Sequence, residues 1–365
     1  MQNMRKVVLW GLAALCLTLA ACKRNAPQPR PTILLVESIV SDTTGTGRLA
    51  AQAGAVGAEG SIAIIGEPES ALALARRFQS TDRMDNVDGR PGRDSLPDFA
   101  GETFSVVMDV FNAPYEHFLS ESPDAGARLD SLREAAVLNA LWAWDSTAVR
   151  PAAKLLIFTS SLQAEYGLFD VDTLQQLCGG KSILLSPADL LLESSYEKGA
   201  RNMAVWTSRP VRKSEAWQSV FRRKGWEGTN LSVLSPSPAL DSRTQLRELL
   251  RQYQAEGRPL DALLVDSYKA DLNALGSEIA IIRQGHTAED ASLAKMLSRD
   301  FFILDLPTQI IQSTYSLLRS RRLFAHRIAL PRLQYYHVVE SARGEPALEA
   351  LSASYVNQTY VQDIH

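Results

Sequence analysis

The sequence predicts an α/β fold in which parallel sheets are flanked by helices. From Thr32 onward, short apolar runs alternate with amphipathic stretches, which is the succession of strands and helices in this fold class. The apolar runs are continuous rather than alternating, as expected for strands that are buried on both faces of a parallel sheet. The chain of 365 residues, 45% of them hydrophobic, is long enough for one large or two modest domains.

The expected elements follow one another along the chain. Strands are predicted at 32–40, 61–65, 104–110, 154–159, 182–185, 202–206, 230–234, 260–265, 301–305 and 334–339. Helices are predicted at 67–79, 125–143, 170–177, 187–199, 213–223, 241–256, 288–298, 307–322 and 345–354. The charged segment 83–101 is rich in turn residues and is predicted to be a loop.

The start of the chain, residues 1–22, has the composition of a signal peptide. Arg5 and Lys6 precede an apolar run, which at about 15 residues is shorter than the roughly 20 that span a bilayer. The run ends in Leu-Ala-Ala-Cys, which resembles a bacterial lipobox, where the cysteine, here Cys22, is acylated and becomes the new N-terminus. The alternative is an ordinary signal peptide that is cut near Ala21.

A lipid anchor at Cys22 would hold the protein on a bacterial membrane. The polar, proline-rich segment 23–31 is then a tether. Because each buried methylene contributes roughly 0.8 kcal/mol, several acyl chains anchor a protein firmly. Lys23 is not the acidic residue that retains enteric lipoproteins in the inner membrane, so we expect the outer membrane, with the facing side left open.

Composition argues against several classes of function. The formal net charge is −3 and no basic block persists, so no nucleic-acid partner is expected. Of the three cysteines, Cys16 lies in the signal segment and Cys22 closes it, which leaves Cys178 and permits neither a disulfide framework nor a zinc cluster. The sequence has no GxGxxG after a strand, no P-loop and no HExxH, and its histidines lack metal-ligand spacing. We therefore expect no cofactor and no metal.

Four stretches of the sequence come in an order that is typical of a known family. They are DVFNAPYE (109–116), KLLIFTSSLQAEYG (154–167), AVWTSRPVRKSEAW (204–217) and DALLVDSYKADL (261–272). Together they resemble the motifs of the aspartate/glutamate racemase superfamily. The tail, FILDLPTQIIQSTYSLL (302–318) and YYHVVESARGEPALEALSASYV (335–356), resembles the strand and helix that return to the first lobe and the terminal strand and helix. The resemblance covers nearly all of 32–365 apart from an insertion at 80–101.

The resemblance implies two pseudo-symmetric α/β lobes, each a parallel sheet flanked by helices, with an active site in the cleft between them. Lobe one is then expected to contain 32–186 plus 305–365, and lobe two 187–304. The first-strand Asp-Ser motif of the family has two candidates in this chain, Glu37-Ser38 and Asp42-Thr43. Members of the family often pair, so the resemblance also allows a homodimer.

The departures from the family pattern concern its chemistry. These racemases use two thiols, one on each face of the substrate α-carbon, and the motifs place Ser160 at the first thiol position and Ser267 at the second. A thiol has a pKa of about 8.5, whereas a serine hydroxyl acts as a base or nucleophile only beside a group that takes its proton. Glu116 stands where the family has a glycine, and its negative charge would repel a bound carboxylate. No catalytic residue is therefore expected.

The same motifs indicate which residues would bind a ligand in the cleft. They are Asp109, Tyr115, Ser160, Ser161, Thr207 and Ser267. Asp109 ends a buried strand, so it is expected either to face the cleft or to cap the loop that follows.

The sequence thus predicts an inactive racemase-like lipoprotein of the cell envelope that binds a small amino-acid-like ligand or a protein partner. Two alternatives stay open. One is an enzyme with altered chemistry, either an active isomerase or racemase, or a hydrolase in which Lys269 takes the proton of Ser267. The other is a sensor similar to type I periplasmic binding proteins, which also have two α/β lobes. The D-x-x-x-x-P-Y segment and the terminal strand and helix favour the racemase layout.

Overall fold

The computed structural model describes residues 31–54, 57–86, 88–119, 125–146, 151–327 and 329–360. The signal segment 1–22 with Cys22, and the first part of the tether up to residue 30, lie outside the described residues. Among the helices of the described ranges, none combines the length and the apolar character that crossing a membrane requires.

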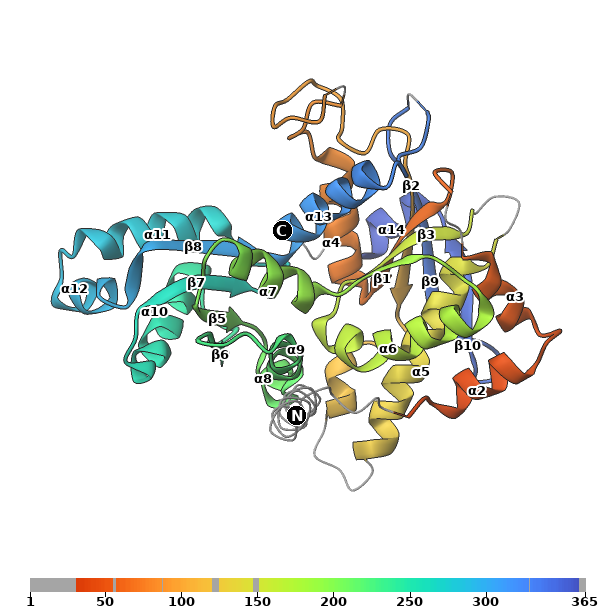
Figure 1. Ribbon diagram of the computed structural model, residues 1–365, viewed down its shortest axis with the longest axis horizontal. Coiled ribbons are helices and arrows are strands. Elements are labelled where there is room, and N and C mark those ends of the chain that lie inside the picture. Colours follow the sequence, from red (N-terminus) through yellow and green to blue (C-terminus); the bar gives the residue numbers. More distant parts are fainter. Residues whose placement is uncertain are drawn as a thin grey trace, which may run out of the picture.

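The larger of two sheets has six strands in the order β10-β9-β2-β1-β3-β4 (Figure 1). Its strands are β1 (Ser61–Gly66), β2 (Thr103–Asp109), β3 (Ala153–Phe158), β4 (Ile183–Leu185), β9 (Arg332–Glu340) and β10 (Pro346–Leu351). All neighbouring strands pair in parallel except β10, which runs antiparallel to β9 at the edge. Every residue of β1 and β3 is buried, which explains the uninterrupted apolar runs in the sequence.

The smaller sheet has four parallel strands in the order β6-β5-β7-β8. They are β5 (Asn202–Trp206), β6 (Asn230–Leu234), β7 (Leu260–Val265) and β8 (Leu297–Asp305). The chain enters this sheet through α7 (Pro187–Glu197) and leaves it through α13 (Leu306–Ser320), and these two helices contact each other. We call the larger sheet with its helices lobe one and the smaller sheet with its helices lobe two, which extends from one side of lobe one in Figure 1.

Helices cover both faces of each sheet. One face of lobe one carries α2 (Leu34–Ser41), α3 (Thr46–Ala53), α5 (Ala125–Trp144) and α6 (Ser161–Cys178), and the other carries α4 (Pro68–Ser80) and α13. One face of lobe two carries α10 (Ser242–Tyr253), α11 (Leu272–Gln284) and α12 (Ala288–Ala294), and the other carries α7, α8 (Arg209–Lys213) and α9 (Ala216–Lys224). The last helix, α14 (Ala353–Tyr360), follows β10.

The hydrophobic core passes from one lobe into the other. Ile62 and Ile64 of β1 belong to one buried cluster, whereas Ala63 belongs to the cluster on the opposite face, because successive side chains of a strand alternate. The cluster of Ile62 also contains Met203 and Val205 of β5. The two lobes are therefore packed against a shared core.

The predicted α/β class, with parallel sheets flanked by helices, is confirmed. The strands predicted at 202–206, 230–234 and 260–265 have those bounds in the structure. The loop predicted at 83–101 is also confirmed for its described residues, 83–86 and 88–101, with one isolated bridge between Met84 and Pro91. Of the three correctly bounded strands, β5 and β7 lie inside the sheet and are largely buried, whereas β6 lies at its edge and is partly exposed.

The strand predicted at 32–40 is wrong, because this segment forms the helix α2. Ile33 and Val36, three residues apart, are buried, whereas Leu34 is 80% exposed. This spacing belongs to a helix with one buried face, and a continuous apolar run of this length does not distinguish it from a strand.

The sheet of lobe one therefore begins at β1, not at residue 32. Neither candidate for the first-strand motif follows a strand: Glu37-Ser38 lies within α2 and Asp42-Thr43 directly after it. The residue that follows β1 is Glu67.

The helix predicted at 345–354 is also wrong. Residues 346–351 form β10, and the helix α14 begins at Ala353. Glu349 of β10 lies opposite His337 of β9, and their side chains are 3.1 Å apart, so a cross-strand pair stabilises this edge.

The bounds of other helices also differ from the prediction. The helix predicted at 170–177 begins at Ser161, the helix predicted at 288–298 ends at Ala294, and α3 and α11 were not predicted.

Candidate functional site

A cavity of about 760 Å³ opens at the carboxyl ends of the lobe-two strands. Its hydroxyl groups come from Thr207, Ser208, Ser235, Ser237, Ser242 and Ser267, its acids are Glu116, Asp241, Glu248 and Asp266, and its bases are Arg209 and Lys269. Glu116 comes from lobe one, and the other polar residues come from lobe two. Open parallel sheets bind ligands at this edge, because the loops after the strands meet there.

Asp266, at the end of β7, is the centre of the polar network between the lobes. Its Oδ2 accepts hydrogen bonds from Ser161 Oγ at 2.8 Å, Thr207 Oγ1 at 2.8 Å and Trp217 Nε1 at 2.9 Å. Ser161 is the first residue of α6 in lobe one, so this carboxylate joins the two lobes. Burial raises the pKa of the Asp266 carboxyl, and the three donors act in the opposite direction.

Further hydrogen bonds between the lobes surround Asp266. Tyr268 donates its hydroxyl to the main-chain oxygen of Thr159 at 3.0 Å. Burial raises the pKa of this phenol well above its usual range, so it stays a donor. Ser208 donates to Glu116 Oε1 at 2.5 Å on the other side of the cavity.

The hydroxyls at the two thiol positions both accept hydrogen bonds from main-chain amides. Ser160 is the N-cap of α6, and its Oγ accepts from the Gln163 N–H at 3.3 Å. Ser267 Oγ accepts from the Lys269 N–H at 3.2 Å. Ser267 lines the cavity and Ser160 does not. The sequence predicted a site position at Ser160 because this serine closely follows an apolar run. In the structure the same serine caps a helix.

Asp109 and Tyr115 lie in a buried cluster and do not line the cavity. The Asp109 carboxylate accepts from the Tyr115 hydroxyl at 3.0 Å, from Asn139 Nδ2 at 2.8 Å and from the N–H and side chain of Asn112. Burial raises the pKa of Asp109 and raises that of Tyr115 well above its usual range. Of the two roles expected for Asp109, the structure shows the one that holds the following loop in place.

Glu67, directly after β1, binds the loop of Tyr115 but does not line the cavity, and the sequence did not predict its role. Its Oε1 accepts from the Tyr115 N–H at 2.8 Å, and burial raises the pKa of its carboxyl. Nearby, Ser70 and Thr159 share a hydrogen bond of 2.7 Å. The signal that could have identified Glu67 is an acid that follows the apolar run 61–65 and Gly66, but the strand predicted at 32–40 placed the first strand end elsewhere.

Comparison with solved structures finds similar chains, whereas none of the protein-family models and none of the curated proteins matches. Glutamate racemase from Francisella tularensis subsp. tularensis SCHU S4, in complex with D-glutamate, is 13% identical, with a TM-score of 0.49 over 84% of this chain and 94% of that chain. Glutamate racemase isoform RacE1 from Bacillus anthracis is 12% identical, with a TM-score of 0.48 over 78% of this chain and 90% of that chain. A putative Asp/Glu racemase from Yersinia pestis is 13% identical, with a TM-score of 0.40 over 71% of this chain and 98% of that chain.

The chain is similar in fold to Asp/Glu racemases. These solved structures are named as glutamate or Asp/Glu racemases, the superfamily that the sequence motifs resemble.

Carboxylates of the chain itself accept hydrogen bonds from donors in the motif stretches. Glu67 accepts from the amide of Tyr115 in the loop that resembles D-x-x-x-x-P-Y-G. Glu116 accepts from Ser208, and Asp266 accepts from Ser161 and Thr207. These donors are therefore already hydrogen-bonded within the protein.

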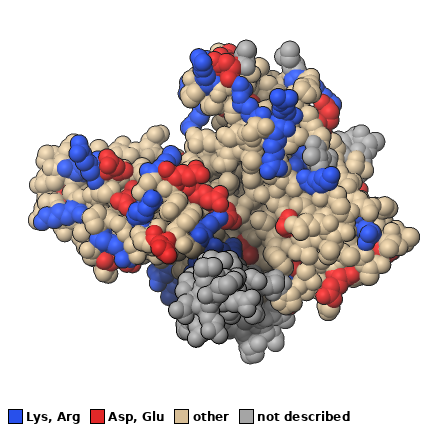
Figure 2. All heavy atoms as spheres, in the orientation of Figure 1, with Lys and Arg blue, Asp and Glu red and all other residues tan. Residues whose placement is uncertain are grey.

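Several charged side chains outside the cavity form ion pairs. Figure 2 shows acidic and basic side chains intermixed over lobe two and its junction with lobe one. Among them, Lys224 lies 2.6 Å from Glu193, and Arg223 of α9 lies 2.5 Å from Glu165 of α6. Within the described part of the chain, no group of three or more His, Cys, Asp or Glu residues is arranged to hold a metal ion.

Proposed function

We propose that this protein is a cell-envelope lipoprotein with a racemase-like fold that does not racemise amino acids and acts as a binding module. The hydrogen bonding of Ser160 and Ser267 carries the proposal. Each hydroxyl accepts from a main-chain N–H, and among the described residues neither makes a hydrogen bond with a carboxylate, an imidazole or an amine. A hydroxyl with no group to take its proton provides neither the base nor the acid of a two-base proton exchange.

A carboxylate of the cleft also argues against binding of an amino-acid substrate. A bound amino acid has a carboxylate that needs donors, and Glu116, which lines the cavity, already accepts from the hydroxyl of Ser208. A second carboxylate beside Glu116 would be repelled. The cleft therefore disfavours glutamate and aspartate.

The contacts of Lys269 argue against a serine–lysine hydrolase. Its Nζ lies 2.8 Å from Glu69 Oε1 of lobe one, and its side chain is 76% exposed. The hydrogen bond between Lys269 and Ser267 involves the lysine main chain, not its amine. The amine is thus directed to a carboxylate of the other lobe, where it takes no proton from Ser267.

The cavity favours a ligand with hydroxyl or amino groups and no carboxylate. Hydroxyl side chains are the most numerous polar groups in its wall, and its acids outnumber its bases. Of the two bases, Lys269 is already paired with Glu69. Hydroxyls and carboxylates accept hydrogen bonds from ammonium and hydroxyl groups, so an amino sugar fits this chemistry.

We expect the protein to incorporate no solvent deuterium at the Cα of enantiopure glutamate or aspartate. The reason is that neither serine can remove the α-proton, as argued above. The measurement is proton NMR of each enantiomer in D₂O with the protein, against the rate in buffer alone. Incorporation faster than in buffer would refute the inactive assignment, and its loss in Ser267→Ala would then identify the base.

The binding part of the proposal is tested with the same protein by calorimetry. Glucosamine is expected to give a binding isotherm and D-glutamate none. Ser267→Trp, which fills the cavity, should abolish the isotherm, whereas Ser277→Trp, on the exposed surface of α11, should leave it unchanged. If glucosamine and a panel of muropeptides give no heat, a small ligand in this cavity is ruled out and a protein partner is left.

The lipid anchor is proposed from the sequence and is tested separately. We expect Cys22→Ala to abolish labelling by radioactive palmitate and to move the protein from the outer-membrane fraction to the soluble fraction. Cys178→Ala is the matched control, because this thiol is buried and burial raises its pKa, so it is a poor nucleophile for an acyl group. Full labelling of Cys22→Ala would contradict the anchor.

A further inference from the structure

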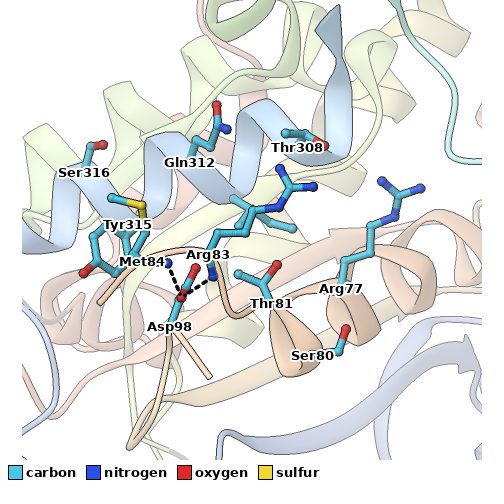
Figure 3. A pocket seen from close by; sticks show the side chains of 11 residues that line it. Arg77, Ser80, Thr81, Arg83, Met84, Asp98, Thr308, Gln312, Tyr315 and Ser316 are labelled. Carbon is cyan, nitrogen blue, oxygen red and sulfur yellow. Dashed lines mark hydrogen bonds between the residues drawn. The ribbon is translucent and has the colours of Figure 1, made fainter. Parts of the chain in front are cut away.

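A second cavity lies between α4 and α13, on the side of lobe one where the insertion 80–101 covers these helices (Figure 3). Its volume is about 520 Å³, within the usual range of small-molecule sites. Part of its wall comes from the insertion, which lies outside the stretches that resemble the racemase superfamily. It is separate from the cavity of Asp266 and shares no lining residue with it.

Asp98 holds the inserted segment over this cavity. Its Oδ1 accepts from the N–H of Arg83 at 2.9 Å and from the N–H of Met84 at 3.0 Å, the two bonds drawn in Figure 3. The Asp98 N–H in turn donates to the main-chain oxygen of Thr81 at 2.8 Å. The wall is thus fixed before any ligand arrives, which lowers the entropic cost of binding.

One end of the cavity is apolar. Ile311 and Tyr315 of α13 are buried side chains that line it together with Met84. The ring of Tyr315 packs edge-on against Phe99 at 6.1 Å and Phe324 at 5.2 Å between ring centroids. This aromatic packing makes the apolar end a rigid surface.

The opposite end carries two cations. In Figure 3 the guanidinium groups of Arg77 and Arg83 lie toward Thr308, away from Tyr315 and Met84. Arg77 Nη1 contacts Asp305 Oδ2 at 3.3 Å. The side chain of Arg83 is exposed and makes no hydrogen bond or ion pair with any described residue. The positive charge of Arg83 is therefore available to a ligand.

We infer that this cavity binds a small amphiphile with one acidic head group, whose apolar chain lies on Ile311 and Tyr315 and whose head group pairs with Arg83. The hydroxyls of Thr81 and Thr308, which also line the cavity, can donate to the same head group. The apolar end disfavours a bare inorganic anion, and the uncompensated guanidinium disfavours a neutral alcohol. A carboxylate and a phosphate monoester share this chemistry.

The test is calorimetry on the full chain with octanoate, octyl phosphate, octanol and inorganic phosphate. We expect octanoate, octyl phosphate or both to bind at least tenfold more tightly than octanol and inorganic phosphate. The tighter of the two acids identifies the class of head group. Equal affinity for octanol and octanoate, or no binding of either acid, would overturn the proposal.

Arg83→Gln is expected to weaken binding of the acid about tenfold, which corresponds to about 1.4 kcal/mol. The matched control is Arg90→Gln, because Arg90 is an exposed arginine of the same insertion, 3.7 Å from Asp88, and does not line the cavity. Its affinity should equal that of the unmodified protein. An unchanged affinity of Arg83→Gln, with far-UV circular dichroism showing both variants folded, would remove Arg83 from the site and refute the proposed binding mode.

Discussion

Replacing Lys154 by methionine is expected to lower the free energy of unfolding by about 3–5 kcal/mol, because it leaves a buried carboxylate without its partner. The side chains of Lys154 and Glu102 are both 0% exposed, and Lys154 Nζ lies 2.7 Å from Glu102 Oε2. The same amine donates to the main-chain oxygens of Ala58 and Leu323, each at 2.7 Å. One ammonium group therefore joins the start of β3, the start of β2 and the segment after α13.

The measurement is equilibrium unfolding in guanidinium chloride, followed by far-UV circular dichroism. Lys181→Met, at an exposed lysine, is the matched control and should change stability by less than about 0.5 kcal/mol. Adding Glu102→Gln to Lys154→Met should recover part of the loss, because glutamine removes the unpaired charge and keeps an acceptor for the Ala325 N–H, which is 2.8 Å from Glu102 Oε1. A loss below 1 kcal/mol in Lys154→Met would show that water reaches this site.

The strands of the two sheets could be predicted from the sequence because of their burial. All residues of β3 and the last four of β7 are buried, and each strand ends in a continuous apolar run, LLIF in β3 and ALLV in β7, which stops at a polar residue. The segment 32–40 is also apolar, but it packs as a helix on the outer face of lobe one. The edge strand β10 was predicted as a helix. Its sequence PALEAL is partly exposed and contains good helix formers, so no continuous apolar run indicates a strand.

The candidate site could be predicted only in part, because Thr207 and Ser267 line the cavity whereas Asp109, Tyr115, Ser160 and Ser161 do not. The motifs identify Ser161 and Thr207, and the structure brings both to one carboxylate. That carboxylate, Asp266, was not among the residues that the motifs indicated. Ser161 and Asp266 are 105 residues apart in the chain, and no local pattern indicates that they meet. Glu67 was not predicted for a related reason. It follows the first strand of the sheet only if that strand is β1, and the sequence predicted the first strand at 32–40.

Asp266→Ala is expected to lower the free energy of unfolding by about 2–4 kcal/mol, because it leaves buried donors without an acceptor. Trp217, Thr207 and Ser161 are all buried, and each donates to Asp266 Oδ2. The hydrogen bond from Ser161 also joins the lobes, so the variant should have a larger radius of gyration in small-angle X-ray scattering. Glu215→Ala, at an exposed acid of lobe two, is the control and should change neither quantity. An Asp266→Ala protein with unchanged stability would mean that the network contributes nothing to holding the lobes together.

Asp266→Asn separates the charge of this side chain from its role as an acceptor. Burial raises the pKa of Asp266 in the folded protein above its usual value of 3.8, so the folded state holds the proton to higher pH than the unfolded state does. The stability that this proton contributes is fully present below pH 3.8 and is lost as the pH rises through the folded-state pKa. Asparagine does not titrate, so the stability advantage of the unmodified protein over Asp266→Asn should be largest at low pH and decrease as the pH rises. A pH-independent difference between the two would show that the Asp266 carboxyl titrates as it does in water, and the cleft would then be open to solvent at its centre.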